Sequence, residues 1–281
     1  MKNLILISIF ILFSFTDPVH AGKPNIPKGI NKDTFCDLER EKYGHVIILL
    51  DLTTDIDSAR KEFINDQVFS EEFFLKYNPF TKFSYFLINH KEYTENKFLF
   101  SKCRPKNGSS KSKKEKATMF ENSKVLSSYF KRFSLAANKE FENIFSTNKD
   151  APYSYIYETI AYIFQSQKSD FTSEQPYREL VIVSDLMQNT TRISFYNACK
   201  ANSNEAKCPT FSDFMKNLSD KDYLLATSPD GKGIDLQMIY LNYRKETNKE
   251  IDTSLKNLWI NYFKGQKFSV KKVITQLDIE N

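Results

Sequence analysis

Two short apolar runs, each ending in a carboxylate, constrain the fold of this chain more than any other feature of its sequence. Residues 45–51 have the sequence HVIILLD, and residues 179–185 have the sequence ELVIVSD. Apolar runs of this length, rich in β-branched residues, are typical of strands that are buried on both faces. We therefore predict two central parallel strands, which end at Asp51 and Asp185.

The segments around these runs alternate between helical and strand patterns. Helices are predicted at Ser58–Tyr77, Ile156–Phe164 and Leu255–Phe263, and Thr118–Phe145 is predicted to form one long amphipathic helix or two consecutive ones. A short helix is predicted at Thr210–Leu218. Further strands are predicted at Thr81–Asn89, Thr94–Cys103, Ile234–Leu241 and Ser269–Ile274. This alternation predicts an α/β fold with a mostly parallel central sheet and helices on both faces, a Rossmann-like three-layer sandwich.

The first 21 residues have the organisation of a secretory signal peptide. A charged start is followed by the apolar run Leu4–Phe15 and by small residues up to Ala21, after which we expect cleavage. The run is shorter than the about 20 residues of a membrane helix, although an uncleaved N-terminal anchor is the alternative. Residues 22–44 are predicted to be extended and residues 45–281 to form the domain, with no later transmembrane helix. The short signal and the lysine-rich, glycine-poor composition favour a bacterial, periplasmic or secreted protein.

The cysteine content fits an exported chain. All four cysteines lie after the predicted cleavage site, and an even number in an oxidising compartment favours disulfides, for which three pairings exist. Cys199 and Cys208 bracket a short polar loop, so a local bridge there would leave Cys36 to join Cys103. The cysteines are too far apart in sequence for the ligand pairs of a zinc site.

A basic loop insertion at residues 104–117 separates two of the predicted elements. Its cations are Arg104, Lys106, Lys111, Lys113, Lys114 and Lys116. Clustered lysines can bind phosphate-rich surfaces, but a lysine-serine loop without interleaved aromatic residues is more often solvated. The net charge of +5 is mild, and we expect no specific nucleic-acid partner.

The ends of the two buried strands carry the chemistry of the chain, because ligands of open parallel sheets bind outside the carboxyl ends of the strands. The sequence there resembles the von Willebrand factor A family. That family places an Asp-x-Ser-x-Ser run after its first strand, a Thr before a middle helix and an Asp after a later strand. The residues that match in type are Asp51, Thr53, Ser154 and Asp185.

This resemblance implies a metal-ion-dependent adhesion site for Mg²⁺, with Mn²⁺ and Ca²⁺ as alternatives, and a protein partner at the strand-end face. Asp55 departs from the family pattern, which has Ser or Thr there, and would add a carboxylate to the site. Thr159 or Ser166 could take the place of Ser154 if the helix were shifted. Without a metal, Asp51 and Asp185 would cap the turns that follow their strands.

The motifs of three enzyme classes are incomplete in this sequence. Haloacid-dehalogenase-like phosphatases also have an apolar strand that leads into a nucleophilic Asp, but Thr53 stands where their second Asp is expected. The chain has no Gly-x-Ser-x-Gly, and Gly231–Gly233 precedes a strand and lacks the third glycine of a dinucleotide fingerprint. The sequence therefore favours a non-enzymatic binding or assembly module of the bacterial envelope, with a Mg²⁺-dependent hydrolase that uses Asp51 as the alternative.

Overall fold

The computed structural model describes residues 29–53, 56–88, 98–109, 111–147, 153–166, 171, 173–199, 208, 210, 212, 229–241 and 249–276. Six strands form one sheet in the order β3-β2-β1-β4-β5-β6. They are β1 (His45–Asp51), β2 (Lys82–Ile88), β3 (Phe98–Cys103), β4 (Arg178–Ser184), β5 (Asp235–Tyr240) and β6 (Ser269–Thr275). The predicted signal peptide and Asp55 lie outside the described residues.

All strand pairs are parallel except the edge pair β2/β3, which is antiparallel. The mostly parallel sheet predicted from the sequence is therefore confirmed. β1 pairs with β2 on one side and with β4 on the other, so the strand order reverses direction between β1 and β4. In open α/β sheets this switch point leaves a crevice at the carboxyl ends of the two strands.

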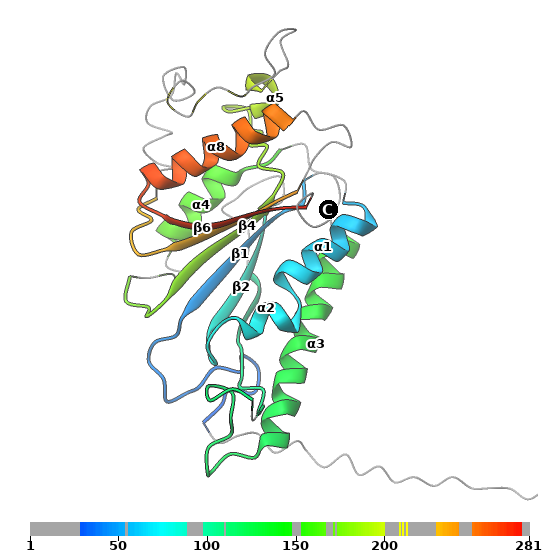
Figure 1. Cartoon of the computed structure of the whole chain (residues 1–281), viewed down its shortest axis with the longest axis vertical. Helices are drawn as coiled ribbons and strands as arrows, with labels where there is room; N and C mark the ends of the chain where they lie inside the picture. The colour runs from blue at the N-terminus through cyan, green and yellow to red at the C-terminus, as the bar shows by residue number, and fades with distance from the viewer. Residues whose placement is uncertain are drawn as a thin grey trace, which may run out of the picture.

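Helices cover both faces of the sheet (Figure 1). One face carries α1 (Ser58–Val68), α2 (Glu71–Leu75) and α3 (Ser123–Thr147), and the other carries α4 (Ile156–Gln165) and α8 (Lys249–Gly265). The residues of β1 alternate between these two layers: Ile47 and Leu49 pack toward α4 and α8, while Val46, Ile48 and Leu50 pack toward the first three helices. This two-sided burial is the reason for the uninterrupted apolar run in the sequence.

Four of the five predicted helices exist, but their ends differ from the periodic pattern. The single helix expected at Ser58–Tyr77 is divided into α1 and α2, because the Ser70 hydroxyl accepts a hydrogen bond from Phe73 N at 3.2 Å and caps a new helix. The helix α3 begins at Ser123 because Asn122 Oδ1 accepts from Lys124 N at 2.9 Å. The short helix α5 (Phe195–Ala198) was not predicted, and most of Thr210–Leu218 is outside the described part of the chain.

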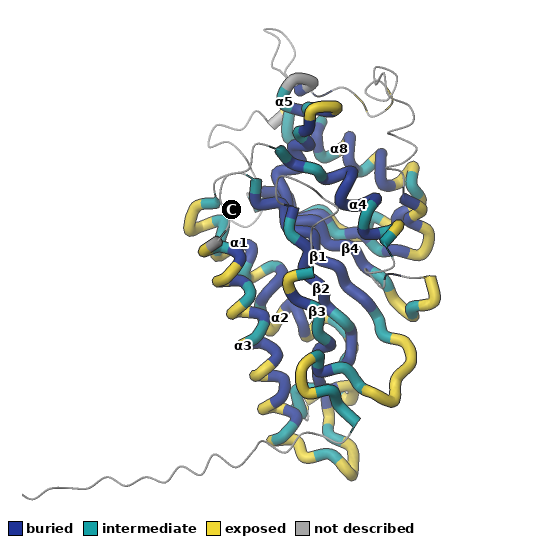
Figure 2. The backbone as a smooth tube through the Cα atoms, turned by 180° about the vertical axis from the view of Figure 1, so that it is seen from behind, coloured by how far each residue is buried: buried dark blue, intermediate teal, exposed yellow. Residues whose placement is uncertain are grey.

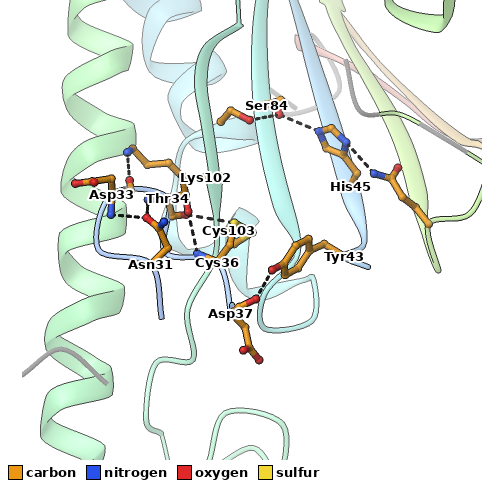
Figure 3. The surroundings of a disulfide bond; sticks show 12 residues. Asn31, Asp33, Thr34, Cys36, Asp37, Tyr43, His45, Ser84, Lys102 and Cys103 are labelled. Atoms are coloured by element: carbon orange, nitrogen blue, oxygen red, sulfur yellow. Dashed lines mark hydrogen bonds between the residues drawn. A yellow bond between two sulfur atoms is a disulfide. The ribbon is translucent and has the colours of Figure 1, made fainter. Parts of the chain in front are cut away.

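The segment before β1, predicted to be extended over residues 22–44, is described from residue 29 on, and this part contains turns and a bridge. Within its described part, Ile30 and Asp37 form an isolated antiparallel bridge and Phe35 is buried. Figure 3 shows that the Cys36–Cys103 disulfide joins this segment to the end of β3. The second disulfide, Cys199–Cys208, is also present, so both predicted bridges are confirmed.

None of the described helices is long and apolar enough to cross a membrane. The longest, α3, has both buried and exposed residues along its length, as Figure 2 shows. Apolar residues such as Phe133 are buried, whereas charged residues such as Lys131 and Arg132 are exposed. Helices of this type stabilise a globular layer by covering a sheet.

Candidate metal site at the strand ends

The two predicted carboxylates lie at the switch point of the sheet. Asp51 is the last residue of β1, and Asp185 directly follows β4. The strands are hydrogen-bonded neighbours in parallel register, with Leu50 opposite Val183, so their ends meet at one edge. Both side chains are buried, with exposed fractions of 2% for Asp51 and 3% for Asp185.

Asp51 organises three hydroxyl groups. Its Oδ1 accepts hydrogen bonds from Thr53 Oγ1 at 2.8 Å and from Thr53 N at 3.3 Å. Its Oδ2 accepts from Ser154 Oγ at 2.8 Å and from Ser184 Oγ at 2.7 Å. Each hydroxyl donates its proton to Asp51 and keeps lone pairs that can accept another hydrogen bond or coordinate a cation.

Ser154 reaches Asp51 because the backbone holds it in place. Ser154 and Asn189 form an antiparallel bridge in which Ser154 N donates to Asn189 O at 2.8 Å and Asn189 N donates to Ser154 O at 3.0 Å. The alternatives do not take this role: Thr159 lies inside α4, where its Oγ1 has no hydrogen-bond partner among the described residues, and Ser166 follows the far end of α4. Ser154 is therefore the hydroxyl before the middle helix that contacts the site.

Ser184 is a member of the cluster that the sequence analysis did not identify as a site residue. Its hydroxyl donates to Asp51 and accepts from Leu186 N at 2.7 Å, so it connects the end of β4 to the following turn. Leu186 has a positive φ of 60°, and its carbonyl accepts from Trp259 Nε1 at 2.8 Å. A non-glycine residue in this conformation is costly, and the surrounding contacts hold it there. In the sequence, the feature that could have identified Ser184 is a hydroxyl residue at the end of an otherwise apolar run.

Asp185 is much less well satisfied than Asp51. Its Oδ1 accepts from Met187 N at 2.9 Å, whereas its Oδ2 is buried without a hydrogen-bond partner among the described residues. Burial and then the nearby negative charge of Asp51 raise the pKa of Asp185 to about 8, against the lowering effects of the Met187 amide and Arg60. Burial also raises the pKa of Asp51, although its three hydroxyl partners oppose the shift.

These residues fit a hard divalent cation. Mg²⁺ prefers oxygen ligands, uses one or two carboxylates and retains several waters. A cation beside Asp185 Oδ2 would satisfy a buried carboxylate oxygen that has no donor among the described residues. Thr53 and Ser154 would offer hydroxyl oxygens already oriented by Asp51. Within the described residues, no group of three or more His, Cys, Asp and Glu side chains comes together, so hydroxyls and water would have to complete the coordination.

The predicted basic loop does not form one cationic cluster. Arg104 is fully buried, and its guanidinium donates to Glu115 Oε1 at 2.7 Å and to Glu115 Oε2 at 3.1 Å. Lys106 Nζ lies 2.8 Å from Glu121 Oε2. The assignment of Arg104 as an anion-binding residue is therefore wrong, because its charge is neutralised inside the protein. The exposed cations of the loop are Lys111, Lys113, Lys114 and Lys116.

A serine–histidine contact occurs elsewhere in the sheet, at the other end of β1. His45 Nε2 lies 2.8 Å from Ser84 Oγ, as Figure 3 shows, and Ser84 Oγ lies 3.0 Å from Ser101 Oγ. His45 and Ser84 are both buried. A nucleophile must meet its substrate, so this buried pair has a structural role as a polar link between strands.

No protein-family model and no curated protein sequence matches the chain. Among solved structures, it is similar to the crystal structure of an aerotolerance-related membrane protein from Bacteroides fragilis that carries multiple mutations to serines. The two chains are 13% identical, the match covers 83% of this chain and 90% of the other, and the TM-score is 0.38. A likeness at this level transfers no ligand, activity or partner to the chain.

Proposed function

We propose that this chain is an exported, von Willebrand factor A-like binding or assembly module of the bacterial envelope. Its strand-end face holds Mg²⁺ and receives an acidic group of a protein partner. The observation that carries the proposal is the Oδ2 atom of Asp185, which is buried beside Asp51 and has no donor among the described residues. Two neighbouring buried carboxylates are unfavourable without a compensating positive charge.

The roles of the residues follow from their contacts. Asp185 supplies a carboxylate ligand, and Thr53 and Ser154 supply hydroxyl oxygens. Asp51 orients these hydroxyls, because it accepts a hydrogen bond from each. When bound, Mg²⁺ would supply a positive centre with exchangeable water positions, and a carboxylate from a partner is a suitable replacement for one of those waters.

Export is part of the proposal and has support from two features. The N-terminal residues have the composition of a signal peptide, and the chain contains two disulfides with no free cysteine among the described residues. Disulfides persist in oxidising compartments such as the periplasm and the extracellular space.

The contacts of Asp51 favour binding over phosphoryl transfer. A nucleophilic carboxylate needs an accessible oxygen, whereas both oxygens of Asp51 accept hydrogen bonds and the side chain is buried. Thr53, which takes the place of the acid in the hydrolase alternative, donates its hydroxyl proton to Asp51.

Thermal unfolding tests the metal site. After treatment with EDTA, addition of Mg²⁺ or Mn²⁺ should raise the melting temperature, because a ligand that binds only the folded state stabilises it by about 2.7 kcal/mol at a hundredfold excess over Kd. Asp185→Asn should abolish the shift, whereas the matched control Asp230→Asn, an exposed carboxylate in a distant turn, should retain it. An equal shift in wild type and Asp185→Asn would place the metal elsewhere.

Activity and partner capture separate the two functional classes. We expect no Mg²⁺-dependent turnover of a panel of phosphate esters, and turnover that Asp51→Asn abolishes would establish the hydrolase instead. We also expect a protein from envelope extract to be retained on the immobilised chain in Mg²⁺ and released by EDTA. Asp185→Asn should not retain it, and retention that is insensitive to both EDTA and this substitution would contradict a metal-bridged contact.

A further inference from the structure

An exposed apolar tip lies far from the strand-end site. Met119 and Phe120 are 88% and 91% exposed, which makes them the most exposed large hydrophobic side chains among the described residues. Water-exposed residues of this size are common singly, but two adjacent ones at a turn form a protruding apolar feature.

Hydrogen bonds fix the turn that carries Met119 and Phe120. Glu121 N donates to Thr118 O at 3.1 Å, which closes the turn around Met119 and Phe120. The Glu121 carboxylate accepts from Thr118 N at 2.8 Å and from Lys106 Nζ at 2.8 Å. Three polar contacts therefore hold the two apolar side chains in an outward position.

The part of the loop that precedes the tip, residues 104–117, is also held by polar contacts. Glu115 binds the buried guanidinium of Arg104 with both oxygens, and its Oε2 also accepts from Asn107 N at 2.9 Å. Gly108 has a φ of +73°, and a Cβ atom at this position would lie 2.4 Å from the Ser123 carbonyl oxygen, so the loop is seated on the first turn of α3.

Four positive charges precede the tip in sequence. Lys111, Lys113, Lys114 and Lys116 are exposed, and none of them forms an ion pair with a described residue. The acidic residue of the same segment, Glu115, is neutralised internally by Arg104. The loop thus presents four exposed lysines, unpaired with any described carboxylate, within nine residues of two exposed apolar side chains.

The tip and the strand-end site lie toward opposite ends of the sheet. The last residue of β3, Cys103, pairs with Lys82 at the start of β2, which places the loop at the amino ends of the parallel strands. Asp51 lies at the carboxyl end of β1. Figure 1 shows the loop below the sheet and the start of α1, which follows β1, at the other end, and Figure 2 shows the loop exposed.

We propose that the apolar tip Met119–Phe120 and the lysines 111, 113, 114 and 116 dock the protein on an anionic lipid surface. Two side chains at a turn cover far less than the about 800 Å² per partner that a stable protein interface buries. A bilayer accepts inserted apolar side chains without a shaped pocket, and each lysine near its surface strengthens binding roughly fivefold. The apolar tip and the lysines that precede it in sequence therefore suit binding to a lipid surface better than binding to a protein.

Co-sedimentation with vesicles tests the proposal with the full chain. Binding should be at least about tenfold stronger to vesicles of equal parts phosphatidylglycerol and phosphatidylcholine than to phosphatidylcholine alone, and should weaken as salt is raised. The variants Met119→Ser/Phe120→Ser and Lys111→Gln/Lys113→Gln/Lys114→Gln/Lys116→Gln should each lose about tenfold or more in affinity. The N-terminal residues are common to all variants, so their contribution cancels in the comparison.

Matched controls remove charge and apolar surface elsewhere. Leu135→Ser changes an exposed leucine on α3, and Lys131→Gln/Lys139→Gln/Lys232→Gln/Lys264→Gln removes four exposed lysines outside the loop. Both controls should bind vesicles like the wild type. Equal binding to both kinds of vesicle, or equal losses in the loop and control variants, would overturn the proposal.

A tryptophan substitution reports on insertion directly. The single native tryptophan, Trp259, is fully buried, so its emission should not respond to lipid. Phe120→Trp should retain vesicle binding and its emission should shift to the blue on binding, whereas Leu135→Trp should show no shift. If the tip variants bound vesicles normally but no longer self-associated in sedimentation velocity, the apolar tip would instead be a contact with a second copy of the chain.

Discussion

At the scale of single residues, Asp51 and Asp185 differ although both are buried carboxylates at neighbouring strand ends. Asp51 accepts four hydrogen bonds, from two hydroxyls at one oxygen and from the Thr53 hydroxyl and amide at the other. Asp185 accepts one, from Met187 N, among the interactions described for it. Asp51 is therefore the organising residue, and Asp185 is the residue that a cation would stabilise.

Ser184→Ala should destabilise the fold through this network. The substitution removes a donor from Asp51 and leaves Leu186 N, which donates to the hydroxyl at 2.7 Å, without its acceptor. An unsatisfied buried group costs about 1–3 kcal/mol, measurable as a lower free energy of unfolding in urea. The control Ser146→Ala, at the exposed end of α3, should change this free energy by less than about 0.5 kcal/mol. Equal effects would mean that Ser184 does not support the site.

Asp185 should make the metal-free protein less stable as the pH rises. Its pKa is about 8 in the folded protein and about 3.9 in an unfolded chain, so between these values the folded state binds more protons. Stability is favoured at low pH and is lost toward pH 8, by up to about 1.4 kcal/mol per pH unit. In EDTA, the free energy of unfolding of Asp185→Asn should fall less than that of the wild type between about pH 5 and about pH 8. Parallel curves would contradict the raised pKa.

The sequence was sufficient for part of this site. Asp51, Thr53, Ser154 and Asp185 were selected by their match in type to a family pattern at the ends of strands and before a helix, and the structure brings the Thr53 and Ser154 hydroxyls to Asp51. Ser184 was missed because a hydroxyl residue at the end of an apolar run is a weak signal by itself, and only the fold shows that it donates to Asp51, 133 residues away. Arg104 was misassigned for a similar reason: nothing in the spacing of its loop indicates that Glu115 folds back to neutralise it.

At the scale of elements, the loop between β3 and α3 has the composition of a solvent-exposed loop but contains a buried ion pair. It is held by the bidentate Arg104–Glu115 ion pair, and Tyr77 O is a further acceptor 2.6 Å from Arg104 Nη2.

The sequence predicted the strands and helices on either side of this loop because their apolar periodicity is strong. It did not predict the division of α1 from α2, since a hydroxyl cap such as Ser70 competes with continued helix only in the context of packing.

Breaking the Arg104–Glu115 pair should be costly. Glu115→Gln leaves a buried guanidinium without its counter-charge, and removing one partner of a buried ion pair costs about 3–5 kcal/mol. The comparison is Glu142→Gln, which breaks the more exposed Lys61–Glu142 pair and should cost no more than about 1 kcal/mol. Chemical denaturation measures both. A cost for Glu115→Gln as small as that of the control would show that the loop does not depend on this pair.

At the scale of the whole molecule, the parallel sheet separates two kinds of chemistry. Its carboxyl ends gather buried carboxylates and hydroxyls at the β1/β4 switch point, because parallel strands bring all their ends to one edge. Its amino ends carry the basic loop, the apolar tip and the Cys36–Cys103 disulfide. A protein attached to lipid through the amino ends would direct its strand-end face away from the membrane, toward partners in the surrounding space.

This arrangement predicts that the two ends act independently. No described contact links the tip turn to Asp51 or Asp185, and energetic coupling between distant sites requires an element with two states that both sites bias. Asp185→Asn should therefore lose the Mg²⁺-dependent rise in melting temperature but bind phosphatidylglycerol vesicles with unchanged affinity. Met119→Ser/Phe120→Ser should lose vesicle binding but keep the Mg²⁺ response. If EDTA weakened vesicle binding of the wild type and not of Asp185→Asn, the ends would be coupled, and metal binding would regulate attachment to the membrane.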